Sequence, residues 1–302
     1  MVSNTSTGSI ETTLSAQDGD AAAAASPRRT TVIRPPSISL KGLTGDLAKL
    51  WRYRDLLYTL SVHRIRVRYK QSVLGVSWAV LQPLALMLIY TVIFSVIAKV
   101  ETGRLPYTLF AFAGLLPWTY FSTSLTNATS GLVSHSQLIT KVYFPREILP
   151  LTYVFAALFD FLIAAFVLAL MMIYHGVAPS PYALYLVPIM LVLTCFATAS
   201  AFFFSATQVR FRDIGVAMPL ILQLWMFATP VVYPLAAVPA RFRPLYQLNP
   251  MVGIIENFRR VLLEAAPPDF ASLSLSAGVA LLLLAASYVY FKHVEATIAD
   301  IV

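Results

Sequence analysis

The chain has 302 residues, of which 58% are hydrophobic and only 12% are charged, and its mean hydropathy is +0.72. A soluble globular domain carries about twice that charged fraction, so the composition excludes an ordinary soluble protein and favours a membrane protein. The net charge is +8, but eleven of the 22 basic residues precede the first long apolar run. Basic residues beside a membrane helix set topology or meet anionic headgroups, which favours membrane lipids over nucleic acid as partners.

Two polar segments precede the first apolar run. Residues 1–43 are rich in Ser, Thr, Ala and Pro, and we expect a disordered tail without chemistry. Residues 44–75 are predicted to be an amphipathic interfacial segment, because Leu50, Trp51 and Leu57 share one helical face and Trp51 suits headgroup depth. Basic and apolar residues alternate over 64–70, a period that suits a strand, but we expect helix because the first span follows closely.

Six apolar runs follow, each about long enough to cross the roughly 30 Å hydrocarbon core of a bilayer. They cover residues 76–98, 106–128, 149–174, 182–207, 216–233 and 271–291. We therefore predict an all-α integral membrane protein, with about six transmembrane helices in a transmembrane domain over residues 76–302.

The distribution of basic residues predicts the orientation. With the N-terminus inside, sixteen basic residues lie inside and six outside, a bias that puts both termini in the cytoplasm. The six are Lys99, Arg104, Arg241, Arg243, Arg259 and Arg260. Four of them fall in the half-apolar segment 234–269, between the last two spans. We expect re-entrant short helices there, which need protein or a water-filled cavity around them.

Asp160 lies near the middle of the third predicted span. An acid inside a membrane is costly and is a functional candidate by default. No basic or histidine partner is evident within the spans, so we expect a hydrogen bond to a Ser, Thr or Tyr of a neighbouring helix. The histidines are scattered without ligand spacing, so no metal site is expected.

The inside loop between the second and third predicted spans combines an apolar patch with a charged rim. The residues concerned are Leu138, Ile139, Tyr143 and Phe144 in the patch, Lys141, Arg146 and Glu147 in the rim, and Pro145, which redirects the chain. Such a surface suits the docking of a partner protein. An ordinary interfacial loop that holds two helices explains the same residues equally well.

Four segments together resemble the permease subunit of the type-2 ABC exporters for polysaccharides, such as O-antigen, capsule and teichoic acid. They are Arg68 to Pro83, Leu138 to Pro150, the Arg-Phe-Arg-Asp-Ile loop at 210–214 and the Leu-Asn-Pro-Met turn at 248–251. The resemblance extends over about residues 45–302. It implies that the loop between spans two and three is a coupling helix that fits a groove on an ABC ATPase.

The chain contains no Gly-x-x-x-x-Gly-Lys-Ser/Thr motif and no Gly-Lys pair. We therefore expect no cofactor in this chain, and we expect a separate ATPase subunit, in two copies, to bind ATP and Mg. Six helices with few polar residues make a poor solitary channel, so a second copy of the chain is expected to complete the pore.

Aromatic residues make up 13% of the chain and gather in the spans. The slightly positive C–H faces of a sugar suit the negative face of an aromatic ring, so a ring-lined tube holds a polysaccharide weakly at many points. This matches what the resemblance implies for spans one and five. We select Tyr90, Phe94, Trp225 and Phe227 as substrate-channel residues; packing and interfacial anchoring are the alternative roles.

These features predict a transport subunit and not an enzyme: the transmembrane half of an ATP-driven exporter of lipid-linked, O-antigen-like polysaccharide in the bacterial inner membrane. The alternative is an integral membrane glycosyl- or acyltransferase that acts on a lipid carrier. That class needs convergent acids or a base near an interface, whereas Glu147, Asp213 and Glu256 fall on different loops.

Overall fold

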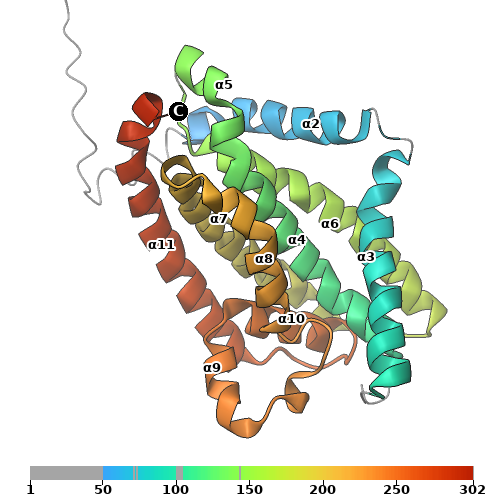
Figure 1. Ribbon diagram of the computed structural model, residues 1–302. Coiled ribbons are helices and arrows are strands. Elements are labelled where there is room, and N and C mark those ends of the chain that lie inside the picture. Colours follow the sequence, from blue (N-terminus) through green and yellow to red (C-terminus); the bar gives the residue numbers. More distant parts are fainter. Residues whose placement is uncertain (1–49, 71, 73, 100–104, 143, 302) are drawn as a thin grey trace, which may run out of the picture. The chain divides into compact units, whose positions relative to one another are not determined.

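A computed structural model describes residues 50–70, 72, 74–99, 105–142 and 144–301, with side chains except at Thr140 and 296–301 (Figure 1). Every regular element in these ranges is a helix, which confirms the predicted all-α class. The predicted tail over residues 1–43 lies outside the described residues. The longer helices are α2 (Arg54–Lys70), α3 (Trp78–Tyr90), α4 (Tyr107–Ser134), α6 (Ile148–Tyr174), α7 (Leu186–Arg210), α8 (Asp213–Phe227), α10 (Pro250–Leu262) and α11 (Phe270–Ile301). The short ones are η1 (Gly75–Ser77), η2 (Thr91–Ile97), α5 (Ser136–Lys141), η3 (Pro181–Tyr185), η4 (Leu235–Ala237), η5 (Ala240–Phe242) and α9 (Arg243–Gln247).

Each of the six predicted spans contains a helix. Four helical stretches are long and apolar enough to cross a bilayer: Gly75–Ile97, Ile148–Tyr174, Pro181–Arg210 and Phe270–Glu295. Of the other two, α4 has 28 residues, about 42 Å at a rise of 1.5 Å per residue, and α8 is a shorter apolar helix of 15 residues. The chain is therefore an integral membrane protein that crosses the bilayer several times.

The predicted end of the fifth span is wrong. Helix α8 stops at Phe227, and residues 228–233 form a turn instead of a further helical segment. Pro230 explains the early end, because a proline has no N–H to donate and disfavours the helical conformation of the residue before it.

Helix α4 is the centre of the bundle. It packs against α3, α6, α7, α8 and α10, and most of its side chains are buried. The helical stretch Gly75–Ile97, which contains α3 and η2, stands at the edge, with only 11% of its most apolar window buried. Its exposed apolar side chains include Leu88 of α3 and Val92 and Val96 of η2.

The short helices and the helix ends lie at two opposite ends of the bundle. Helices α2 and α5 and the C-terminal end of α11 lie at one end of the bundle, and α9 lies at the other (Figure 1). An even number of crossings between α2 and the end of α11 gives this arrangement, and the placement of both termini in the cytoplasm stays a prediction.

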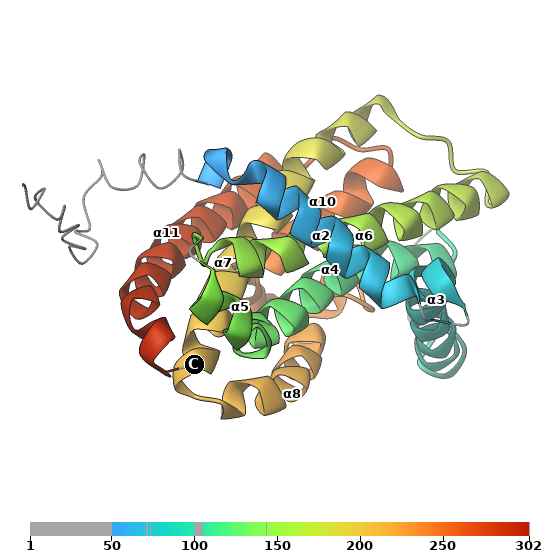
Figure 2. The ribbon, with the colours of Figure 1, turned by 90° about the horizontal axis from the view of Figure 1, so that it is seen from above.

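Helix α2 lies across the first of these ends and packs against α6 (Figure 2). It continues to Lys70, so the alternating segment 64–70 is helical as predicted. Leu50 and Leu57 pack against the core, but Trp51 and Tyr58 are 72% exposed and point away from it. Arg64 of α2 faces the bundle. Its guanidinium carbon stacks over the ring of Tyr153, 3.7 Å from the ring centre.

The segment between α8 and α11 contains the expected short helices. Asn249 caps α10, because its side-chain oxygen accepts a hydrogen bond from the Met251 N–H at 3.1 Å and Pro250 occupies the first helical position. Helix α10 is almost wholly buried against α4, α7 and α11. Protein thus surrounds its backbone, as non-spanning backbone at membrane depth requires.

Candidate coupling surface and substrate-facing helices

The predicted docking patch is partly turned into the protein. Ile139 is 6% exposed and Phe144 is 6% exposed, and both belong to a buried cluster with Phe202 and Phe291. Leu138 packs against the same cluster. These side chains hold the loop onto α7 and α11: Ile139 and Phe144 are buried there, whereas Leu138 is half-buried.

Two residues of the predicted rim, Arg146 and Glu147, bind to residues near the C-terminal end of α11. Glu147 is only 1% exposed and forms an ion pair with Lys292, which also pairs with Glu295 at 2.8 Å. Arg146 donates from its guanidinium to the Glu295 carbonyl at 2.6 Å. Burial raises the pKa of the Glu147 carboxyl, and Lys292 opposes that shift. The start of α6 is therefore joined electrostatically to the last helix.

The exposed part of the loop is small. Lys141 is exposed, Val142 is 51% exposed and Pro145 is half-buried, whereas Tyr143 lies outside the described residues. The coupling role assigned to residues 138–147 stays a prediction. Among the side chains of this range that the structure describes, those of Lys141 and Val142 are exposed.

A polar network links α2 to the start of α5. The Arg64 guanidinium donates to the Thr152 hydroxyl at 2.8 Å and lies 3.5 Å from His135 Nε2. Burial and the adjacent Arg64 lower the pKa of His135, so its ring is neutral at pH 7. The network assigns the tautomer: Nδ1–H donates to the Gly131 carbonyl at 3.0 Å and Nε2 accepts from Arg64. The interfacial helix and the α4–α5 junction therefore share one set of contacts.

Acidification is expected to weaken this network. Because the pKa of His135 is lowered on folding from an ordinary value of about 6.5, the unfolded chain binds the proton first as the pH falls. The stabilisation is complete above about pH 6.5 and is lost as the pH falls through the lower folded-state pKa. Thermal unfolding midpoints across this range measure the loss. The His135→Gln variant should flatten the profile, and an unchanged profile in this variant would contradict the assignment.

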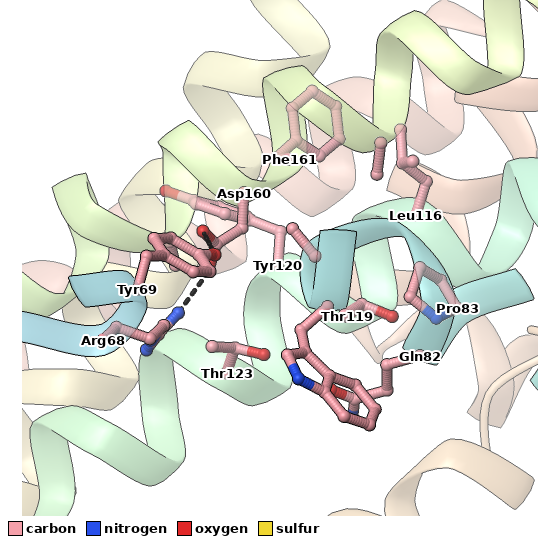
Figure 3. A pocket seen from close by; sticks show the side chains of 14 residues that line it. Arg68, Tyr69, Gln82, Pro83, Leu116, Thr119, Tyr120, Thr123, Asp160 and Phe161 are labelled. Atoms are coloured by element: carbon pink, nitrogen blue, oxygen red, sulfur yellow. Dashed lines mark hydrogen bonds and ion pairs between the residues drawn. The ribbon is translucent and has the colours of Figure 1, made fainter. Parts of the chain in front are cut away.

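Asp160 has a basic partner that the sequence analysis missed. Arg68 of α2 forms an ion pair with one carboxylate oxygen, and the Tyr69 hydroxyl donates to the other at 2.5 Å (Figure 3). Burial and the hydrogen bond to Asp160 raise the pKa of Tyr69 to about 12, so this phenol stays a donor at neutral pH. The expected tyrosine partner is confirmed, but the charge is compensated from the interfacial helix and not from within the spans.

The four predicted channel residues lie in three different parts of the structure. The rings of Tyr90 and Phe94 lie 6.1 Å apart at the end of the first span, and the Tyr90 hydroxyl reaches Met226 Sδ of α8 at 3.9 Å. Trp225 packs edge-on against Phe121 of α4, with ring centres 5.2 Å apart. Phe227 is 46% exposed. The structure thus brings spans one and five together at Tyr90 but does not gather all four rings.

Trp225 also lines an apolar groove of about 780 Å³ between α7, α8 and α11. Phe196, Phe203, Phe204, Tyr246 and Tyr290 supply further rings to its walls. No local pattern in the sequence indicates this groove, because its rings come from helices far apart in the chain.

Arg259, counted above among the outside loop charges, is buried. Its side chain is 2% exposed and donates to three carbonyls, those of Phe110 at 3.2 Å, Pro230 at 2.9 Å and Val231. The guanidinium also lies 3.7 Å from the centre of the Phe110 ring. Because these carbonyls belong to α4 and to the turn after α8, Arg259 joins three parts of the chain at the α9 end of the bundle.

Comparisons with known proteins agree with this arrangement. Residues 55–263 match the ABC-2 type transporter family. The chain is 32% identical over 246 residues to the O-antigen export system permease protein RfbA of Myxococcus xanthus, which covers 81% of this chain and 94% of that protein. It is 34% identical over 161 residues to a protein of the same name from Klebsiella pneumoniae, covering 53% of this chain and 61% of that protein. The family match spans well over half of the sequence and the Myxococcus relative is aligned along nearly its full length, so the chain belongs to the ABC-2 type transporter family.

Proposed function

We propose that this chain is the transmembrane half of an ATP-driven exporter that moves lipid-linked, O-antigen-like polysaccharide across the bacterial inner membrane. The observation that carries the proposal is the alignment with the O-antigen export permease of Myxococcus xanthus over 94% of that protein. Both termini are assigned to the cytoplasm, in line with the basic residues that surround α2, α5 and the end of α11. The relatives are named as permeases, which disfavours the alternative transferase acting on a lipid carrier.

A separate ABC ATPase subunit, present in two copies, supplies the energy in this proposal and binds ATP and Mg. The chain itself has no phosphate-binding glycine loop of the Walker type. Two copies of this chain form the pore. The weakly packed α3 and the exposed apolar side chains of α8, such as Val216, Leu220 and Leu224, offer the surface for the second copy and for lipid.

Deletion of the gene in its own bacterium tests this function. We expect surface polysaccharide to be lost and its lipid-linked form to accumulate inside the cell, and we expect a plasmid copy of the chain to reverse both effects. Unchanged surface polysaccharide in the deletion strain would refute the proposal. Loss of surface polysaccharide without internal accumulation would point instead to a synthetic enzyme.

The coupling surface gives a sharper prediction. Lys141→Glu combined with Val142→Asp places two acids on the exposed part of the loop, and we expect co-purification of the ATPase subunit to fall about tenfold or more, because charge reversal at a docking centre costs over 1.4 kcal/mol. Lys70→Glu, an exposed change at the same end of the bundle, is the control. Phe144→Ala should instead lower the amount of folded protein, since that side chain is buried. Full co-purification with the double variant would show that the loop does not dock.

A further inference from the structure

A cavity of about 310 Å³ lies beneath the C-terminal end of α2, between α3, α4 and α6. We propose that it is a binding site for one neutral sugar ring of the exported polysaccharide. This inference rests on the function proposed above and adds a site lined by residues of a single chain, none of which lines the apolar groove.

The walls of the cavity carry the groups that a sugar ring needs. Figure 3 shows Arg68 and Tyr69 on one side and Gln82 on the opposite side, with Thr119 and Thr123 of α4 also in the lining. The lining thus holds a carboxylate, a guanidinium, an amide and hydroxyls, which are the kinds of acceptor and donor that the hydroxyls of a sugar ring can bind. Three helices and α2 contribute these groups, so the site exists only in the folded chain.

Aromatic rings complete the lining. Trp78 opens onto the cavity from the first turn of α3, and Tyr120 and Phe161 line its inner part. The Tyr120 hydroxyl donates a hydrogen bond to the Thr194 hydroxyl at 3.2 Å, outside the cavity. Tyr120 therefore contributes its ring, and not its hydroxyl, to the cavity wall. Rings of this kind pack against the C–H face of a sugar.

The charge balance favours a neutral ligand over a phosphate. Arg68 and Asp160 neutralise each other, and the two oxygens of Asp160 are engaged by Arg68 and Tyr69. A phosphate here would lie beside a carboxylate, whereas phosphate sites gather uncompensated arginines, lysines or helix N-termini. The polar group recognised is therefore a hydroxyl-bearing ring and not the phosphate of a lipid carrier.

Size and position agree with a single ring. Sites for small molecules have volumes of about 300–1,000 Å³, and this cavity is at the lower end. The Arg68 side chain is 35% exposed and that of Asp160 is 17% exposed, so the polar wall opens toward the end of the bundle that carries α2. A substrate made in the cytoplasm arrives from that side.

The test is saturation-transfer NMR on the full-length chain in nanodiscs of phosphatidylglycerol, with the methyl glycosides of glucose, galactose, mannose, rhamnose and N-acetylglucosamine as probes. We expect transfer to at least one glycoside. The Thr123→Val and Gln82→Met variants should each weaken its binding about fivefold, the effect of one lost hydrogen bond. These two variants leave the Asp160 ion pair intact, whereas Asp160→Asn strands Arg68 and can fail to fold. Thr207→Val, at a half-buried position of α7 outside the cavity lining, is the control and should bind normally.

The outcomes separate this inference from the function on which it rests. Absent transfer to every glycoside, or equal transfer in Thr123→Val and wild type, overturns the sugar site even when the strain exports polysaccharide normally. A second result would also overturn the proposal. In it, nanodiscs made with phosphatidylethanolamine displace the glycosides, and native mass spectra show that lipid retained by wild type but not by Gln82→Met. The cavity would then bind a zwitterionic headgroup. Transfer that depends on Thr123 and Gln82 supports it.

Discussion

The Arg259→Met variant is expected to lose about 3–5 kcal/mol of stability, the range found when one partner is removed from a buried charged network. Methionine fills a similar volume but donates nothing, so the carbonyls of Pro230 and Val231 lose their partner in a buried site. The Phe110 carbonyl loses its extra donor as well. The thermal unfolding midpoint of the purified protein, and its level in the membrane, measure the effect.

Arg260→Met is the matched control, because the neighbouring arginine is exposed and donates only to the Pro267 carbonyl. It should change the midpoint little. Arg259→Lys should recover part of the loss, since an ammonium keeps the charge but cannot reproduce the planar fork that reaches three carbonyls. An Arg259→Met protein as stable as Arg260→Met would show that the buried network does not hold α10 in place.

Gly114 of α4 provides an independent check on the same contact. A methyl group at this position would lie 2.8 Å from Arg259 Cζ and still closer to the guanidinium nitrogen and the Val231 oxygen. A Gly-to-Ala change inside a helix ordinarily stabilises by roughly 0.5–1 kcal/mol, so the sign is reversed here. We expect Gly114→Ala to destabilise wild type and to cost less in the Arg259→Met background, as coupled neighbours do.

The second large effect is expected at the other end of the bundle. Glu147→Gln leaves Lys292 without its buried counter-charge, and Lys292→Met leaves Glu147 buried without this cation. Each single change should cost up to about 3–5 kcal/mol, with Lys292→Met the more severe because Glu147 is 1% exposed and has no comparable second cation. Thermal unfolding midpoints of the single variants and of the combined Glu147→Gln, Lys292→Met variant measure this.

The combined variant is the informative one. Removing both charges should recover part of the loss, because replacing a whole buried pair costs less than breaking it. Glu264→Gln, an exposed acid at the α9 end, is the control and should be close to wild type. Additive losses in the combined variant would contradict direct pairing between α6 and α11.

Local pattern predicted the helices well. The apolar runs located six helical segments, four of them in stretches long and apolar enough to cross a bilayer, because length and hydropathy are properties of consecutive residues. The same reasoning placed the end of the fifth span too far along, since it weighed the apolar character of Val231 and Val232 above the effect of Pro230 on the backbone. The segment 64–70 shows the opposite case, in which a two-residue period misleads and helix forms because α2 is anchored at Arg64, Arg68 and Tyr69.

The sequence by itself determined that this is a multi-pass helical membrane protein, which residues form its spans, and which exporter family it resembles. Only the tertiary structure decided the partners of its polar residues: Asp160 with Arg68, Glu147 with Lys292, and Arg259 with the carbonyls of α4 and of the turn after α8. These pairs lie from 28 to 149 positions apart in the chain. Hydropathy reports how many apolar atoms a segment carries, whereas pairing depends on how neighbouring helices tilt and cross, which no local pattern contains.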